Sequence, residues 1–229
     1  MDGGYEVRPI DEAVGLLAQR GFAPEQVIDI GANIGTATIE WLSRFPAAAG
    51  AAFEPDADNL ELLRDNLSAN RLLDRVTIFP MALSDRDGTV ELERSDDNFG
   101  DHRVRLRDVP GRLGEDQRPV SRVPAGRFDT LVESGELALA GRVLTNMDAQ
   151  GHEGHILGAA QRLLAHPMVV EYWPYALERS GGLELFLRAL DAYAGITVLD
   201  GERRSIGVAA LRDMAPELGV GHVDLLLVP

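Results

Sequence analysis

Hydrophobic positions along the chain fall into two alternating patterns. Short apolar runs predict buried strands at residues 27–30, 49–53, 76–79, 143–148, 168–171, 195–199 and 223–228. Apolar residues spaced three and four apart predict helices at residues 11–21, 34–45, 59–70, 154–165 and 183–194. Strands that alternate with helices are typical of an α/β fold, here a doubly wound, mostly parallel sheet of seven strands.

The first strand runs directly into a turn bracketed by glycines. Residues 27–35 read VIDIGANIG, and an amphipathic helix follows. Gly31 and Gly35 let the backbone turn tightly and approach a ligand, and the helix start offers unpaired N–H groups. Asn33 stands where a dinucleotide fingerprint needs its second glycine, and no lysine follows as in a phosphate-binding P-loop. The alternative is a tight connection without a ligand.

Two carboxylates and a later turn indicate which nucleotide this corner binds. Asp29 would repel a pyrophosphate but suits a ligand with an ammonium group. Glu54 and Pro55 end the second strand, at the interval where nucleotide folds place a ribose-binding acid. A cationic nucleoside without phosphate, such as S-adenosylmethionine, fits both acids. Ala82 and Leu83 follow the third strand and suit an adenine ring, unless they form an ordinary strand-end turn.

Two blocks of sequence resemble a known family. Residues 27–92 resemble the cofactor half of a class I methyltransferase, and residues 143–160 are similar to the FkbM signature K-x-D-x-E-G-x-E. Asp148, Gly151 and Glu153 match that signature, whereas Asn146 replaces its lysine and Gln150 its first acid. The resemblance implies S-adenosylmethionine as cofactor and a last, antiparallel strand placed between its neighbours. It also implies O-methylation of a hydroxyl on a specialised metabolite, such as a polyketide, peptide or sugar moiety.

Methylation of an alcohol needs a group that orients the hydroxyl and a base that accepts its proton. Ligands of doubly wound sheets bind at the carboxyl ends of strands, where Asp148, Gln150 and Glu171 lie. We expect Asp148 to order the substrate, and His102 to accept the proton because histidine titrates near neutral pH. Gln150 cannot act as a base. The alternatives are that Asp148 caps the next helix and that His102 is a solvated loop residue.

Metal binding is not expected from the histidines. His152 and His155 are three residues apart, whereas the H-E-x-x-H zinc motif needs a spacing of four. Glu153 is expected to complement the start of a helix or to satisfy backbone donors there. A Mg²⁺ ion held by carboxylates such as Asp148 stays open, although the sequence shows no dense carboxylate cluster.

Composition limits the remaining choices. With 229 residues and 45% hydrophobic content, one domain is expected: a leading helix in 1–26, a cofactor half in 27–92, an insertion at 94–127 and the rest of the sheet in 128–229. The chain has neither cysteine nor lysine, which excludes disulfides, thiolate catalysis and Schiff bases. A net charge of −15 disfavours nucleic acid as a partner. No apolar run reaches membrane-spanning length, so we expect a cytoplasmic protein.

The insertion at 94–127 has an unusual composition. It is punctuated by glycine and proline and contains eight arginines: 94, 103, 105, 107, 112, 118, 122 and 127. Short runs at 102–106 and 119–123 suggest strands. We expect this segment to cover the substrate, a small hydroxylated molecule that is free or bound to a carrier, with arginines facing an anionic group. The alternative is a solvated excursion.

Two other functions compete with methyl transfer. A nicotinamide-dependent oxidoreductase would use a similar sheet, but Asn33 argues against it. A non-catalytic protein that retains a cofactor pocket is the other alternative, which Gln150 and Asn146 keep open.

Overall fold

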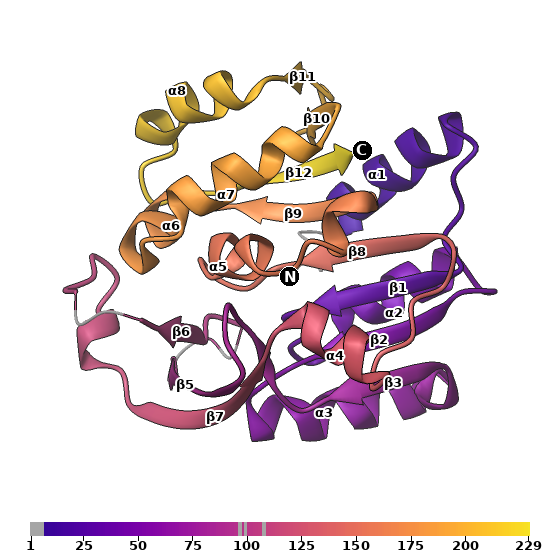
Figure 1. The fold of residues 1–229 in the computed structure, drawn as a ribbon, viewed down its shortest axis with the longest axis horizontal. Coiled ribbons are helices and arrows are strands. Elements are labelled where there is room, and N and C mark those ends of the chain that lie inside the picture. The colour runs from indigo at the N-terminus through magenta and orange to yellow at the C-terminus, as the bar shows by residue number, and fades with distance from the viewer. Residues whose placement is uncertain (1–6, 96–97, 99, 107–108) are drawn as a thin grey trace.

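The computed structural model describes residues 7–95, 98, 100–106 and 109–229. Its main sheet contains β1 (Gln26–Ile30), β2 (Ala49–Phe53), β3 (Val76–Phe79), β8 (Val143–Met147), β9 (Met168–Tyr172), β10 (Gly195–Val198), β11 (Ser205–Ile206) and β12 (Val223–Val228). These strands lie in the order β11-β10-β12-β9-β8-β1-β2-β3 (Figure 1). Five neighbouring strands run parallel: β3, β2, β1, β8 and β9. Strand β12 is antiparallel to both β9 and β10.

This topology confirms the predicted sheet. All seven predicted strands are present, and the last one, β12, lies between its neighbours β9 and β10. The two-residue strand β11 adds an eighth strand at one edge, where it pairs with β10. It was not predicted, because its two residues are too short to give an apolar run.

Helices cover both faces of the sheet. One face carries α1 (Val7–Gln19), α2 (Thr36–Arg44) and α3 (Ala57–Ala69), and the other carries α4 (Phe128–Ser134), α5 (Glu153–Gly158), α6 (Pro174–Ser180), α7 (Leu183–Ala189) and α8 (Val208–Leu218). Neighbouring strand residues point to opposite faces. Val169, for example, packs with the first group of helices, whereas Met168 and Val170 pack with the second.

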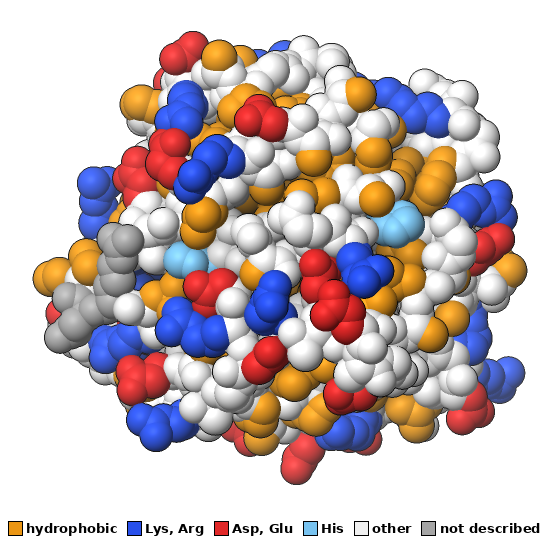
Figure 2. Space-filling view, viewed as in Figure 1, with side chains coloured by type: hydrophobic (Ala, Val, Ile, Leu, Met, Phe, Trp, Pro, Cys, Tyr) orange, Lys and Arg blue, Asp and Glu red, His pale blue; other side chains and the backbone are white. Residues whose placement is uncertain are grey.

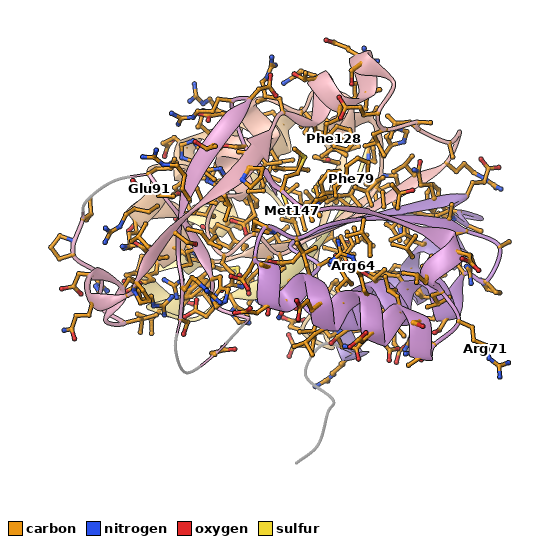
Figure 3. The ribbon with its side chains drawn as sticks, turned by 90° about the horizontal axis from the view of Figure 1, so that it is seen from below. Arg64, Arg71, Phe79, Glu91, Phe128 and Met147 are labelled. Carbon is orange, nitrogen blue, oxygen red and sulfur yellow. The ribbon has the colours of Figure 1, made fainter. Side chains whose placement is uncertain are left out.

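The apolar layer between the main sheet and helices α4 to α8 is visible from below the molecule (Figure 3). In Figure 3, Phe79, Phe128 and Met147 point into the interior, whereas Arg71, just after α3, points to solvent. Phe79 stacks on Phe53 with ring centroids 4.6 Å apart. This layer forms one wall of the cavity described below.

The helix predicted at 154–165 is shorter than expected. It ends at Gly158, and a separate 3₁₀ turn follows at Leu163–Ala165. Between them, the backbone N–H groups of Gln161 and Arg162 donate to the carboxylate of Asp129, at 3.0 and 3.3 Å. Because a side chain satisfies these donors, the helical hydrogen-bond ladder stops. Helices α4, α6 and α8 were not predicted.

The insertion and the segment just before it form a second, smaller sheet. The preceding segment supplies β4 (Ala82–Leu83) and β5 (Gly88–Glu93), and the insertion supplies β6 (Arg103–Arg105) and β7 (Val120–Gly126). These strands lie in the order β4-β7-β5-β6. The short strands expected within 94–127 are therefore confirmed, but both pair with β5. Residues 96–97, 99 and 107–108 of the insertion lie outside the described residues.

A buried ion pair joins the small sheet to the main domain. Glu93 at the end of β5 is fully buried and accepts two hydrogen bonds from Arg179 of α6, at 2.9 and 2.7 Å. Arg105 donates to the same carboxylate at 2.8 Å. Such a bidentate pair fixes orientation as well as distance. It supports our proposal that the insertion and the main sheet form one domain.

Charged side chains of both signs lie on the surface of the molecule. On the face shown in Figure 2, arginine side chains are interspersed with acidic ones. Together with the net charge of −15, this mixture is a poor match for a phosphate backbone. None of the helices in the described part of the chain combines the length and apolar composition needed to cross a bilayer.

The close packing of α5 generates a stability prediction. A Cβ at Gly154 would lie 2.0 Å from the carbonyl oxygen of Gly182, whereas a Cβ at Gly158 would have only Leu185 nearby, at 3.7 Å. Gly154→Ala should therefore lower the free energy of unfolding by about 1–3 kcal/mol. Gly158→Ala, in the same helix, should leave it unchanged or raise it by up to about 1 kcal/mol. Urea unfolding of both variants tests this, and equal effects would contradict the packing described.

Candidate functional site

The site lies where the strand order of the main sheet reverses. Strands β1 and β8 are parallel neighbours, and Ile30 is in register with Met147. The next residues, Gly31 and Asp148, therefore meet at the carboxyl ends of the two strands, and the N–H of Asp148 donates to the carbonyl of Ile30 at 2.9 Å. Ligands of open α/β sheets bind in this crevice.

Gly31 and Gly35 were expected to let the backbone approach a ligand, but in the structure both make room for other parts of the protein. Gly31 has a φ of 83°, and a Cβ there would lie 1.9 Å from the carbonyl oxygen of Asp148. The space beside Gly31 is thus filled by the loop after β8 rather than reserved for a ligand. Gly35 has a φ of 92°, and its Cβ would lie 2.7 Å from Leu63. Gly35 lets α2 pack against α3 and does not line the cavity.

A cavity opens beside this turn. The predicted cofactor residues that line it are Gly31, Asn33, Glu54, Pro55, Ala82 and Leu83. All three predicted catalytic residues, His102, Asp148 and Gln150, line it as well. The structure therefore brings nine of the predicted site residues to one cavity, and leaves out Gly35 and Asp29.

Glu54 is buried at the floor of the cavity. Its carboxylate accepts the N–H groups of Asn33 and Asp56, at 2.9 and 2.7 Å. Burial raises the pKa of Glu54 to about 7, against the lowering effect of these two hydrogen bonds. Glu54 therefore exchanges its proton near neutral pH. The side chain of Asn59 also hydrogen-bonds to this carboxylate, which still leaves a lone pair to which a ligand hydroxyl can donate.

Asp29 does not face the cavity, contrary to the direct ligand contact that the sequence suggested. It is 1% exposed; its carboxylate accepts a hydrogen bond from Asn146 at 2.9 Å and another from the hydroxyl of Thr38. The reason is the two-residue period of a strand, which places Asp29 on the same face as Val27, toward α1 and α2. Burial raises the pKa of Asp29 to about 6.

A second, larger cleft adjoins the cavity. Its polar and aromatic lining includes Glu171, Trp173, His222 and Asp224, from β9, β12 and the segments beside them. The cleft and the cavity share Gly31, Asn33, Gly100, Asp148 and Gln150. Two ligands bound in these spaces would therefore meet beside Asp148 and Gln150.

His102 occupies the cavity side of this junction. Its side chain is 5% exposed, which rules out the alternative of a solvated loop residue. Its Nδ1 accepts the N–H of Ser95 at 3.1 Å, and burial lowers the pKa of His102. The neutral ring therefore carries its proton on Nε2 and has no lone pair left for a substrate proton. This position argues against the proton-accepting role predicted for His102.

Asp148 lies at the junction itself. Helix α5 begins at Glu153, so Asp148 is not its cap. Gln150 donates from Nε2 to Oδ1 of Asp148 at 2.5 Å, and burial raises the pKa of Asp148. Gln150 has a φ of 52°, a left-handed conformation that is uncommon outside glycine.

A cluster of acids at this point was missed by the sequence reasoning, which expected no dense carboxylate group. Carboxylate oxygens of Asp148, Glu153 and Glu171 lie within 4.8 Å of one another. Glu153 also accepts the N–H groups of Ala149 and Gly151, at 2.8 and 3.2 Å, which confirms its predicted role toward backbone donors. Burial raises the pKa of Glu153 to about 7 and that of Glu171 well above its usual value, and the neighbouring acids add to both effects.

The arginines of the insertion pair mainly with the protein itself, contrary to the substrate contact expected of them. Arg94 pairs with Asp56 at 3.0 Å, Arg103 with Glu115 at 2.6 Å, and Arg118 contacts Asp101. Arg107 lies outside the described residues. These pairs hold the small sheet and its loops together next to the cavity.

Comparison with known proteins identifies the family. A family model described as the methyltransferase FkbM domain matches residues 29–192, which is more than half of the chain. The chain belongs to the FkbM methyltransferase family. It is therefore an S-adenosylmethionine-dependent methyltransferase and not a nicotinamide oxidoreductase.

The chain is also similar to individual proteins. It is 27% identical over 173 residues to the 2-O-methyltransferase NoeI of Sinorhizobium fredii (strain NBRC 101917 / NGR234), an alignment that covers 72% of this chain and 68% of NoeI. Among solved structures, a candidate caffeoyl-CoA O-methyltransferase from Staphylococcus aureus matches with a TM-score of 0.51 at 8% identity. The match covers 96% of this chain and 82% of the Staphylococcus aureus chain. A candidate rRNA methylase from Clostridium thermocellum has the same TM-score at 12% identity, covering 96% and 97%. These two structures show a shared fold.

The raised pKa of Glu54 generates a prediction about pH. In the unfolded chain Glu54 ionises near pH 4.5, whereas in the native state it holds its proton up to about pH 7. The native state therefore binds more protons in this window, and stability falls as the pH rises through it. Glu54→Gln removes this effect, so from pH 5 to pH 8 it should gain up to roughly 2–3 kcal/mol in free energy of unfolding relative to the unsubstituted protein.

Urea unfolding at both pH values measures this difference in the absence of cofactor. The exposed Glu61→Gln is a matched control, which should follow the unsubstituted protein at both pH values. Parallel pH curves for Glu54→Gln and the control would contradict the burial of an ionisable carboxyl at this position.

Proposed function

We propose that this chain transfers the methyl group of S-adenosylmethionine to a hydroxyl oxygen of a small molecule. The nucleoside would bind in the cavity beside Glu54, and the acceptor in the adjoining cleft. The observation that carries this proposal is the junction of the two spaces at Asp148 and Gln150. The similarity to a 2-O-methyltransferase supports oxygen as the methylated atom.

The lining of the cavity fits the adenosine part of the cofactor. Ala82, Leu83 and Phe53 supply an apolar wall that suits an adenine ring. Glu54 supplies an acceptor for ribose hydroxyls, at the end of β2 where nucleotide folds carry such an acid. A pKa near 7 makes this acceptor stronger as the pH rises, because the ionised carboxylate accepts only.

The cationic part of the cofactor would lie toward the junction. Asn33 lines both spaces, and its side-chain oxygen is buried without a hydrogen-bond partner among the described residues. A buried acceptor of this kind costs free energy unless a ligand donates to it. We propose that it receives a hydrogen bond from the ammonium group. Asp29 would act indirectly, by holding Thr38 and Asn146 behind the turn.

Asp148 is the residue that we propose for the acceptor hydroxyl. S-adenosylmethionine supplies a methyl group on a positively charged sulfur, so the protein must position the attacking oxygen and remove its proton. Asp148 reaches the junction from the loop after β8, and Gln150 holds one of its oxygens in place. Because burial raises its pKa, the Asp148 carboxylate accepts a proton more readily than a solvated one does.

The cleft suggests the kind of acceptor. Trp173, His222 and Asp224 line it together with Glu171, so an aromatic surface lies beside several hydrogen-bonding groups. This combination suits a hydroxylated molecule with both an apolar and a polar side, such as a sugar moiety or another specialised metabolite, either free or bound to a carrier. A polyketide or peptide with hydroxyl groups belongs to the same chemical class.

Two variants should separate cofactor binding from catalysis. Glu54→Ala should weaken binding of S-adenosylhomocysteine about tenfold or more, because it removes a charge-assisted hydrogen bond of about 1.5–3 kcal/mol. Asp148→Asn should bind this product with nearly unchanged affinity but transfer methyl groups at least about a hundredfold more slowly. Calorimetry measures the affinities, with NAD⁺ as a control that should not bind.

Transfer is measured with S-adenosylmethionine labelled with ¹³C in its methyl group and a panel of hydroxylated acceptors. The carbon chemical shift of the product identifies an O-methyl group. A product labelled on nitrogen or carbon would contradict the proposal, and so would undiminished turnover in Asp148→Asn.

A further inference from the structure

Three carboxylates from separate segments converge beneath the junction. Asp148 comes from the loop after β8, Glu153 is the first residue of α5, and Glu171 lies in β9. One oxygen from each lies within 4.8 Å of the other two. Oxygens that bind one ion at 2.0–2.6 Å lie no farther apart than about 4–5 Å, so these three have the spacing of a ligand set.

Each of the two glutamates has one carboxylate oxygen without a hydrogen-bond partner in the described part of the chain. Oε2 of Glu153 and Oε2 of Glu171 are buried and unpaired within the described residues, although the two side chains are 0% and 6% exposed. Their other oxygens are engaged: Oε1 of Glu153 accepts backbone N–H groups, and Oε1 of Glu171 lies 3.1 Å from Nδ1 of His222. Buried carboxylate oxygens without partners are strongly unfavourable, so the cluster calls for a positive ligand.

The nearby cations of the protein do not provide that ligand. Arg103 is close enough to lower the pKa of Glu171, but its guanidinium is engaged by Asp101 and Glu115, both at 2.6 Å. His222 contacts Oε1 of Glu171 and is close enough to lower the pKa of Asp148, but its side chain is partly exposed. Asp224 adds a further negative charge, which raises the pKa of Glu171.

We propose that Asp148, Glu153 and Glu171 bind one hard divalent cation of the Mg²⁺ or Mn²⁺ type. Carboxylate oxygens are the ligands that such ions prefer, and a chain without cysteine offers no thiolate for softer metals. Asp148 and Glu171 line the cleft, which gives the ion a path of entry and open coordination positions on the acceptor side.

The ion would also contribute to the reaction, and this part of the inference rests on the proposed function. A divalent cation held at the junction would attract the oxygen of a hydroxyl bound in the cleft and lower its pKa. Gln150 would still hold Oδ1 of Asp148, so that the ligand set keeps its orientation.

Manganese binding tests the site directly. The full chain is treated with a chelator, dialysed and titrated with Mn²⁺, and free Mn²⁺ is followed by electron paramagnetic resonance. We expect one Mn²⁺ to bind per chain, with displacement by Mg²⁺. Glu153→Gln, Glu171→Gln and Asp148→Asn should each weaken binding about tenfold or more, whereas the exposed Glu136→Gln should not. Circular dichroism and thermal unfolding show whether each variant is folded.

Absence of Mn²⁺ binding to the unsubstituted chain would overturn the inference, and the cluster would then be neutralised by protons. Equal binding by the cluster variants and Glu136→Gln would overturn it too, because the ion would then lie elsewhere. Calorimetry with S-adenosylhomocysteine on the same metal-free sample separates the two proposals. Retained binding of this product without any binding of Mn²⁺ would remove the cation site and leave the proposed methyl transfer standing.

Discussion

The site depends on the parallel pairing of β1 with β8. This pairing brings two chain segments more than a hundred residues apart into register at Ile30 and Met147, so that their following loops touch. The contact is made by backbone atoms, with the carbonyl of Asp148 filling the space beside Gly31. The cavity for the nucleoside and the cleft for the acceptor open on either side of this contact. A shift of either strand by one residue would turn Asp148 away from the junction.

The crevice is also rich in carboxyl groups that are reluctant to ionise. Asp29, Glu54, Asp148, Glu153 and Glu171 all have raised pKa values, and burial is the main cause at each. Such groups reduce the stability of the protein at neutral pH, and they cluster where function requires them. A sulfonium cofactor and a divalent cation are both positive, so each would favour the ionised form of the acids around it.

Much of the fold could be predicted from the sequence, because buried parallel strands are continuous apolar runs and β2, β3 and β12 have the predicted bounds. Glu54 could be placed at the cavity from its position after the second strand. The predicted contact of Asp29 with the ligand was wrong. The two-residue period of a strand already places Asp29 on the same face as Val27, which helices α1 and α2 cover. The acid cluster was missed because it depends on strand order, which brings Glu171 beside Asp148, and on where α5 begins. The partners of the arginines in the insertion depend on long-range contacts that no local pattern shows.

A crystal structure of the chain with S-adenosylhomocysteine would show whether the cofactor and acceptor spaces meet at Asp148. We expect the adenine to lie beside Ala82 and Leu83, the ribose hydroxyls to lie within hydrogen-bond distance of Glu54, and the sulfur to face Asp148 across the junction. A nucleoside bound outside this cavity, or one whose sulfur points away from the cleft, would contradict this expectation.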